Sequence, residues 1–370
     1  MTGNMISYRP SQIVVHDDSR NDEVTREILD RLQGIPVRTT HDVDSVISEF
    51  GEFPDPRTAA KRVLILSRYP GRFMKICPGS GAEICCNYHV INLTSNCHFE
   101  CTYCVLQSYL NNPSLIVYTN VDDLLNEVGE TLRQNPQRFF RIGTGELADS
   151  LALDDITHFS KRLVPFFASL QNAVLELKTK SNTISNLQDL DHGDHSIISW
   201  SVNSKRVCAG EELKAATLEE RLHAARQCQE WGYKVGFHFD PLIYYQGWES
   251  EYEETVKDIF RFVEPSRVAW ISLGGMRFTP HLREIVRQRF PHSKIPYGEY
   301  VPGHHGKLRY FRPIREEMYE RMRGWIKEAA PQVFIYLCME SRDVWKCSFG
   351  NAPHDSLQLS DQMDAIAKDD

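Results

Sequence analysis

The sequence predicts an α/β fold, an open, partial (β/α)6 barrel of the TIM type with an extension at each end. Six short apolar segments of strand length recur along the middle of the chain, and longer amphipathic stretches separate them. Several of these stretches begin with Asp, Thr or Pro, which favour the first turn of a helix. Strands that alternate with helices pair in parallel, and six such units favour an open barrel over a closed eightfold one.

Length and composition indicate an ordinary folded protein. The 370 residues are 41% hydrophobic and 25% charged, and they can bury a full core. No apolar run approaches the roughly 20 residues that cross a bilayer, and the start of the chain lacks the pattern of a leader, so we expect a cytoplasmic protein without membrane contact. The net charge of −8 gives no general attraction to nucleic acid, so such contact needs a local basic patch.

Residues 1–86 are expected to form an N-terminal α/β extension. A helical pattern covers Asp22 to Arg31, and an apolar strand covers Val63 to Leu66. The segment closes in CPGSGAEICC, whose Gly and Pro residues are typical of a loop.

Residues 87–295 are expected to form the barrel. Its predicted strands are Val90–Leu93, Phe139–Ile142, Val174–Leu177, Ile197–Val202, Val235–Phe239 and Val268–Leu273. Its predicted helices are Val121–Gln134, Ile156–Leu170, Leu218–Trp231, Glu251–Phe262 and Pro280–Arg289.

Residues 296–370 are expected to form a C-terminal extension that covers the substrate. The composition shifts there to Gly, His, Arg and Tyr, with His304 and His305 in a loop tip. A helix over Ile314–Ala329, a strand over Val333–Leu337 and a frayed polar tail are predicted to follow.

Three cysteines form the most specific motif. The segment VINLTSNCHFECTYCVLQ places Cys97, Cys101 and Cys104 at C-x3-C-x2-C directly after the first barrel strand, on the kind of loop that carries active sites in such barrels. Three thiolates can hold three irons of a [4Fe–4S] cube and leave the fourth iron open. A zinc site would need a fourth ligand, for which His98 is the neighbouring candidate, and free structural cysteines are the simplest alternative.

With this motif the chain resembles the radical SAM enzymes. The resemblance implies that S-adenosylmethionine (SAM) chelates the open iron and that one electron cleaves it to a 5′-deoxyadenosyl radical, which abstracts hydrogen. It also implies an external electron donor such as flavodoxin or ferredoxin.

The second-strand segment RIGTGELADS resembles the family's GGE motif. The resemblance implies that Gly143 and Gly145 let the backbone approach SAM and that Glu146 contacts its amino group. The same letters also fit a G-x-G-x-x-A dinucleotide fingerprint, although the expected acidic residue does not follow. Glu146 could also be an incidental surface carboxylate.

Further stretches are similar to the spore photoproduct lyase branch of this family. LELKTKSN and IISWSVNSK place Lys180 and Ser201 at strand ends that resemble SAM-contacting positions, and Asn203 joins this cofactor-binding set. QGWESEY, MRFTPHLREIVRQRFPHSKI and GKLRYFRP extend the resemblance over roughly residues 85–337.

Two positions depart from that branch. The family's second-strand loop carries a hydrogen-donor cysteine, and Glu146 occupies its position here. Tyr103 keeps one tyrosine of the family's relay, while Val105 replaces the other. We expect Cys338 to be a substitute donor, with a buried inert cysteine as the alternative. An auxiliary cluster at Cys77, Cys85 and Cys86, joined by Cys338 or Cys347, is a further alternative.

Candidate substrate-binding residues follow the later strands. His238 and Asp240 alternate in KVGFHFDP and are expected to face the barrel interior, and Arg277 follows the sixth strand. A structural His–Asp contact and a salt bridge from Arg277 to another loop are the alternatives. Lys307, Arg309 and Tyr310 belong to a basic and aromatic stretch suited to phosphate contact and base stacking, although ordinary solvated charge also explains it.

Three functions are therefore compared. The first is a radical SAM enzyme acting on a nucleic acid or nucleotide, such as a DNA photolesion. The second is a radical SAM epimerase or rearranging enzyme for a small molecule, which suits the acidic net charge and the missing loop cysteine. The third is a noncatalytic metal-binding module that uses the same cysteines. The sequence leaves the oligomeric state open.

Overall fold

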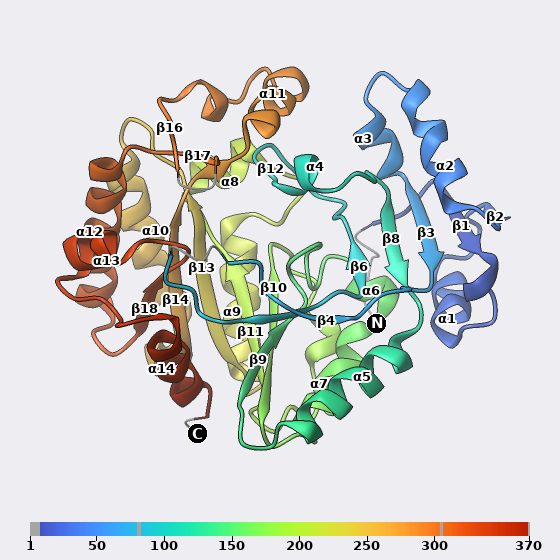
Figure 1. Ribbon diagram of the computed structural model, residues 1–370, viewed down its shortest axis with the longest axis horizontal. Helices are drawn as coiled ribbons and strands as arrows, with labels where there is room; N and C mark the ends of the chain where they lie inside the picture. The colour runs from blue at the N-terminus through green and yellow to red at the C-terminus, as the bar shows by residue number, and fades with distance from the viewer. Residues whose placement is uncertain (1–7, 80–82, 304–305, 369–370) are drawn as a thin grey trace.

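The main sheet of the protein is a curled half-barrel. The computed structural model describes residues 8–79, 83–303 and 306–368. Parallel pairing joins seven strands in the order β18-β14-β13-β11-β10-β9-β5, and β4 adds an antiparallel edge (Figure 1). The predicted open barrel is thereby confirmed. These strands are β4 (Met74–Ile76), β5 (His89–Ile91), β9 (Phe140–Gly143), β10 (Ala173–Thr179), β11 (Ser196–Ser201), β13 (Lys234–Leu242), β14 (Val268–Gly275) and β18 (Phe334–Leu337).

Most of the predicted helices cover the outer face of this sheet, whereas Pro280–Arg289 lies at the mouth of the barrel (Figure 1). Thr217 begins α9 with a capping box in which its hydroxyl accepts from Glu220 N, and the Thr279 hydroxyl accepts from Leu282 N at the start of α11. The helices are α5 (Val121–Gln134), α6 (Asp154–Thr157), α7 (Phe159–Ala168), α9 (Leu218–Glu230), α10 (Trp248–Phe262), α11 (Pro280–Arg289) and α12 (Arg312–Ala329). The single helix predicted over Ile156–Leu170 is divided between α6 and α7 at His158, which adopts a left-handed conformation with φ of 51°.

The C-terminal segment differs from the prediction in two ways. Its strand, β18, pairs with β14 and so extends the barrel sheet to a seventh parallel strand. The predicted frayed tail is wrong, because the chain continues into α13 (Arg342–Phe349) and α14 (Ser356–Lys368). Leu359 and Met363 of α14 are buried, and Asp364 binds Arg141 of β9 at 2.6 Å. These contacts with the barrel hold the last helix in place.

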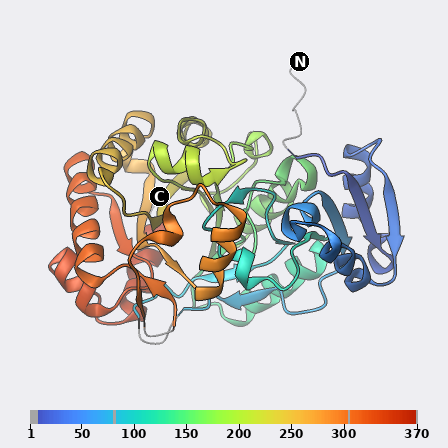
Figure 2. The same cartoon turned by 90° about the horizontal axis from the view of Figure 1, so that it is seen from above.

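A second sheet lies beside the barrel, at the opposite end of the molecule from α12 and α13 (Figures 1 and 2). Its order is β2-β1-β3-β8-β6, with strands β1 (Gln12–His16), β2 (Val37–Thr40), β3 (Val63–Ser67), β6 (Thr94–Ser95) and β8 (Leu115–Tyr118). The sequence predicted β3 and the helix α1 (Glu23–Arg31) but missed the other strands of this sheet. The helices α2 (Val43–Glu49) and α3 (Pro56–Ala60) complete this part.

Short elements border the mouth of the barrel along the upper edge of Figure 1. They are β7 (Glu100–Cys101), α4 (Leu106–Tyr109), α8 (Lys205–Glu211), β12 (Glu212–Leu213), β15 (Arg277–Phe278), β16 (Val301–Pro302) and β17 (Leu308–Arg309). Single 3-10 turns cover Asp17–Ser19, Phe50–Glu52, Ser185–Leu187, Pro265–Arg267 and Ile295–Tyr297.

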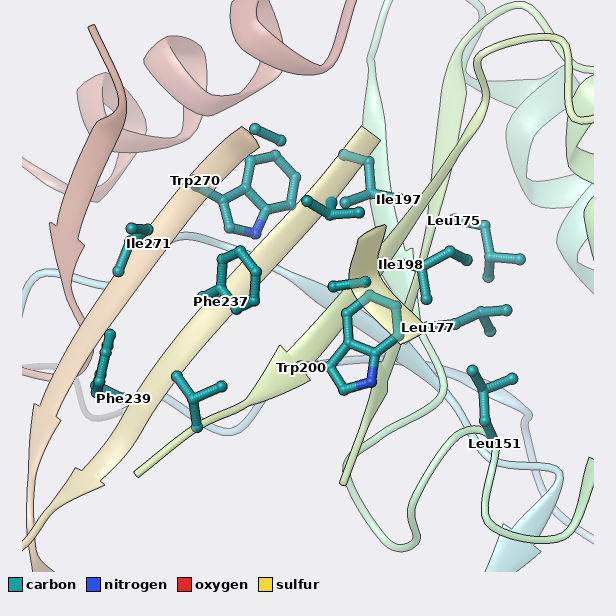
Figure 3. Packing of buried hydrophobic residues seen from close by; sticks show 14 of the residues in the cluster. Leu151, Leu175, Leu177, Ile197, Ile198, Trp200, Phe237, Phe239, Trp270 and Ile271 are labelled. Atoms are coloured by element: carbon teal, nitrogen blue, oxygen red, sulfur yellow. The ribbon is translucent and has the colours of Figure 1, made fainter. Parts of the chain in front are cut away.

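The core lies between the sheet and its helices. Leu175, Leu177 and Trp200 belong to the buried apolar cluster shown in Figure 3, and each is at most 1% exposed. Burying one such large apolar side chain stabilises the fold by about 2 kcal/mol. Glu176 and Lys178 alternate with the two leucines along β10, so they point to the other face, into the barrel. None of the helices in the described residues combines the length and apolar character needed to cross a membrane.

Candidate active site

The cysteine loop begins at a tight turn. Asn96 adopts a left-handed conformation with φ of 69°, which Asn tolerates better than most residues. Its Oδ1 accepts from Cys97 N at 2.8 Å, and its Nδ2 donates to Pro113 O at 2.6 Å. The turn therefore fixes the direction in which the loop leaves β6.

The rest of the loop is held by backbone pairing. β7 pairs antiparallel with β12, which places Cys101 opposite Glu212. Thr102 N donates to Glu211 O at 2.8 Å, and Gln107 Nε2 donates to the carbonyls of Cys101 and Thr102 at 3.2 and 3.0 Å. A loop fixed at so many points can present its thiols in a constant geometry.

The three cysteines line one pocket of about 370 Å³, and most of the predicted site residues line it too. Three thiols on the wall of an open pocket fit a [4Fe–4S] cluster, in which they would hold three irons and leave the fourth without a protein ligand. Besides Cys97, Cys101 and Cys104, the lining includes Tyr103, Gly145, Glu146, Asp149, Lys178, Lys180, Ser201, Asp240, Arg277, Lys307 and Met339.

A buried carboxylate that the sequence analysis missed joins several of these residues. The side chain of Glu212 is fully buried and binds Arg221 Nη1 at 2.6 Å and Lys180 Nζ at 3.9 Å, and the Tyr103 hydroxyl donates to it. Burial by itself raises the pKa of Glu212, but Arg221 and Lys180 outweigh it and lower that pKa to about 2. An ionised Glu212 therefore orients both Lys180 and Tyr103.

A second missed carboxylate ties the second-strand loop to Lys180. Asp149 Oδ1 accepts from Ala152 N at 2.9 Å and from the Thr179 hydroxyl at 2.6 Å. Its Oδ2 accepts from Lys180 N at 2.6 Å. An Asp that bonds backbone N–H groups two and three residues later is typical of a turn, which is the signal that could have identified it.

Of the residues that resemble the GGE motif, Gly145 and Glu146 line the pocket and Gly143 does not. Glu146 Oε2 accepts from Asn92 Nδ2 at 3.5 Å. Gly143 is buried at the end of β9, outside the lining, where a Cβ atom would overlap the Tyr88 hydroxyl. The absence of a side chain at Gly143 is thus required for packing against Tyr88.

Ser201 lines the pocket, but the structure does not bring Asn203 to it. Asn203 is 2% exposed, and its Nδ2 donates to Pro241 O at 3.0 Å and to Glu212 Oε1 at 3.5 Å. Its Oδ1 accepts from the Tyr252 hydroxyl. These bonds connect three segments of the barrel wall.

Asp240 and Arg277 lie together on the pocket wall. Arg277 Nη2 is 3.3 Å from Asp240 Oδ1, and Nη1 donates to Cys338 O at 3.0 Å. The salt bridge considered for Arg277 is therefore present, and its partner is another predicted site residue. A Cβ atom at Gly274 would overlap the Asp240 carboxylate, so glycine makes room for this pair.

His238 lies deeper in the barrel, outside the pocket lining. It is 4% exposed, with Nδ1 2.7 Å from Ser272 Oγ and Nε2 2.9 Å from Glu176 Oε1. Glu176 also accepts from Ser199 Oγ at 2.5 Å and from Trp270 Nε1 at 3.0 Å. The sequence missed this polar network, which joins four strands below the pocket.

Of the basic and aromatic stretch, only Lys307 lines the pocket. Arg309 is buried and binds Glu83 at 2.9 Å and Glu340 at 2.7 Å. Tyr310 is also buried, stacks on Tyr300 and accepts from Tyr244 N at 3.0 Å. Arg309 and Tyr310 thus bind other residues of the protein, and neither side chain lines the pocket.

Cys338 is partly exposed beside the Asp240–Arg277 pair, and its Sγ is 3.9 Å from Arg277 Nη2. The other cysteines considered for an auxiliary cluster are Cys77, Cys85, Cys86 and Cys347. Across residues 8–79, 83–303 and 306–368, no three His, Cys, Asp or Glu side chains converge on a single metal ion. This includes the cysteine triad, whose thiols would instead each bind a different iron of a cluster.

Known proteins resemble this chain in sequence and in fold. A family model described as spore photoproduct lyase matches residues 8–338. Spore photoproduct lyase from a Geobacillus species is 29% identical over 256 residues, which cover 67% of this chain and 75% of the relative. The Bacillus subtilis enzyme is 24% identical over 257 residues, with the same two coverages.

Solved structures share the fold. A variant of spore photoproduct lyase superimposes with a TM-score of 0.81 at 24% identity, and the match covers 89% of this chain and 99% of the other. A variant described as having bound AdoMet and dinucleoside spore photoproduct gives a TM-score of 0.78 at 22% identity, covering 90% and 99%.

Proposed function

The chain belongs to the spore photoproduct lyase family, and from that premise we propose that it repairs a DNA photolesion of the spore photoproduct type. It is a radical SAM enzyme, and a [4Fe–4S] cluster and S-adenosylmethionine are its cofactors. A related structure that holds both AdoMet and the dinucleoside photoproduct supports the proposed substrate. We also propose that flavodoxin or ferredoxin supplies the electron, and that the enzyme works in the cytoplasm, where thiols stay reduced.

The observation that carries the proposal is the single pocket that contains both the cysteine triad and the strand-end residues. The cofactors supply a 5′-deoxyadenosyl radical when bound. In our proposal Cys97, Cys101 and Cys104 hold the cluster, and Gly145, Glu146, Lys180 and Ser201 bind SAM beside it. Glu212 keeps Lys180 in place, and the apolar residue Met339 helps to exclude water from the mouth.

Cys338 is proposed as the hydrogen-atom donor to the product radical. Burial raises the pKa of its thiol, and the nearby Asp240 carboxylate raises that pKa further, while Arg277 opposes the shift. The thiol therefore stays protonated at neutral pH, which is the form that can give up a hydrogen atom.

Anaerobic turnover tests the proposed function. The reconstituted enzyme, given SAM and dithionite, is expected to form 5′-deoxyadenosine and to convert dinucleoside spore photoproduct to two thymidine units, while an undamaged dinucleoside stays unchanged. Cys101→Ala is the matched control and should lose iron and both products. SAM cleavage without loss of the photoproduct would refute the lesion as substrate and leave the enzyme class intact.

A small-molecule substrate is the second candidate, and the charge of the pocket favours it. Lys178, Asp240 and Arg277 line the cavity, and polar substrates such as sugars bind well between charged and hydrogen-bonding groups. Deuterium transfer into 5′-deoxyadenosine from a pool of labelled sugars, with no transfer from labelled photoproduct, would favour this alternative.

A further inference from the structure

A second pocket, here called the β18 pocket, lies at the start of β18, away from the active site. Its volume is about 390 Å³, and it shares no lining residue with the active-site pocket of about 370 Å³. Its walls come from α12, α13, α14 and residues 332–335, and these elements lie together beside the barrel in Figure 1. Met339, beyond the other end of β18, lines the active-site pocket. A molecule in the β18 pocket would therefore leave the active site free.

The β18 pocket is positively charged. Arg323 and Lys327 line it one turn apart on the same face of α12, and none of its described lining residues is acidic. Lys327 Nζ donates to Pro331 O at 2.7 Å and to Val333 O at 2.8 Å, which fixes the ammonium group at the turn between α12 and β18. Burial lowers the pKa of Lys327, and the charge of Arg323 lowers it further. The two cations thus repel each other with no carboxylate on the pocket wall to compensate them.

The side chain of Arg323 is held in place by an aromatic ring and by no carboxylate. Its Cζ atom lies 5.5 Å from the ring centroid of Phe349 on α13, and within the described part of the chain it has no hydrogen bond or ion pair. By contrast, Arg315 and Arg321 of the same helix bind carboxylates at 2.9 and 3.1 Å. A guanidinium group that rests on an aromatic ring still presents its N–H edge, which binds phosphate or carboxylate oxygens in pairs.

The other walls add hydrogen-bonding groups and apolar surface. Trp345 lines the pocket and is 3% exposed, and its Nε1–H has no acceptor among the residues that the structure describes. Buried donors normally have a partner, so an oxygen atom of a bound molecule would complete this wall. Four exposed side-chain amides stand at the rim, those of Gln332, Asn351, Gln358 and Gln362. An inorganic anion would fill only part of this volume, so the pocket suits an anion that carries an organic group.

We propose that the β18 pocket binds a small organic phosphate of about the size of a nucleoside monophosphate. Its phosphate pairs with Arg323 and Lys327, which provide a bidentate partner and a point charge. A phosphate monoester carries close to two negative charges at neutral pH and so compensates both cations, whereas a single carboxylate compensates one. The organic group lies against the apolar wall and binds the amides at the rim. This site is separate from the active site and does not depend on the substrate proposed above.

Calorimetric titration of the reconstituted enzyme tests the site, with thymidine 5′-monophosphate as the probe. We expect the nucleotide to bind with a Kd of about 1 mM or lower. Inorganic phosphate should bind at least about tenfold more weakly because it lacks the organic group, and thymidine should not bind because it lacks the charge.

Two variants assign the binding to the β18 pocket. Arg323→Met removes a cation at a partly exposed position, and Gln332→Glu places a carboxylate on the exposed rim. Each is expected to weaken binding of the nucleotide at least about tenfold. Arg321→Met, on the same helix but outside the lining, is the matched control and should keep the wild-type affinity.

Three results would overturn the proposal. Wild-type affinity in both Arg323→Met and Gln332→Glu would place the nucleotide elsewhere on the protein. Equal affinity for inorganic phosphate and the nucleotide would show that the pocket does not recognise the organic group. No binding of the nucleotide at about 10 mM would show that the two cations do not form a phosphate site.

Discussion

At the scale of single residues, Glu212 shows how one buried carboxylate organises a site. It compensates Arg221, whose side chain is also fully buried, and it contacts Lys180 and Tyr103. Removing one partner of a buried ion pair is costly because the other charge stays buried without compensation. Lys180 and Tyr103 line the pocket, and their positions therefore depend on Glu212, which does not line it.

Glu212→Gln is expected to lower the free energy of unfolding by about 3 kcal/mol, because it keeps the volume but leaves Arg221 unpaired. Urea denaturation followed by circular dichroism measures the loss. Glu219→Gln, an exposed change at the start of α9, is the control and should stay within about 0.5 kcal/mol of the wild type. Equal stability of the two variants would show that Arg221 finds another partner.

His89 makes stability depend on pH. Burial lowers the pKa of His89 to about 4, and Arg138 and Arg141 add to the effect. Since an unfolded histidine has a pKa near 6.5, the unfolded chain binds a proton between these values that the folded chain does not. The free energy of unfolding should therefore fall as the pH drops from about 6.5 toward 4.

Between pH 7 and pH 5 the contribution of His89 amounts to about 2 kcal/mol. Urea denaturation at both pH values is expected to show a pH-dependent loss that is smaller by about this amount in His89→Gln than in the wild type. His223→Gln, at an exposed position on α9, is the control variant. The same slope in His89→Gln and wild type would contradict the assignment.

At the scale of elements, short sequence patterns predicted those features that depend on residues close together in the chain. The cysteine spacing, the strand ends and the helices with clear periodicity were predicted, because their signals lie within a few residues. Tyr103 and Glu212 bond across 109 positions, so no local pattern could reveal that contact. α14 was missed because its apolar residues are few, and its main anchor is an ion pair with Arg141 from a strand far earlier in the chain.

The anchor of α14 can be tested directly. Arg141 is 3% exposed, and Asp364 provides its ion pair while Ser360 Oγ accepts at 3.1 Å. Asp364→Asn is expected to reduce the free energy of unfolding by about 2 kcal/mol, with α14 becoming accessible to protease first. Asp361→Asn, on the exposed face of the same helix, is the control. Unchanged proteolysis in Asp364→Asn would show that burial of the helix alone suffices.

At the scale of the whole molecule, the N-terminal part supports the cysteine loop. Glu100, one residue before Cys101, is 6% exposed and binds Arg289 of α11 at 3.0 Å and Lys61 at 3.8 Å. Arg289 also binds Asp55, which caps α3, at 3.1 Å. A single ionic network, buried at Glu100 and Arg289 and more exposed at Asp55, therefore connects the second sheet, the barrel and the loop that carries the thiols.

Arg289→Met should consequently affect both stability and the metal site. The change removes the central charge of the network, and we expect the free energy of unfolding to fall by about 3 kcal/mol because Glu100 keeps only the more distant Lys61 and Lys214. A loosened loop should also hold its cluster less well, so iron per chain after anaerobic desalting should drop at least twofold. Arg287→Met, on the same helix and paired only with Glu284 among the described carboxylates, is the matched control. Lower stability with full iron content would mean that the network joins the two sheets but that backbone pairing of β7 with β12 alone fixes the cysteine loop.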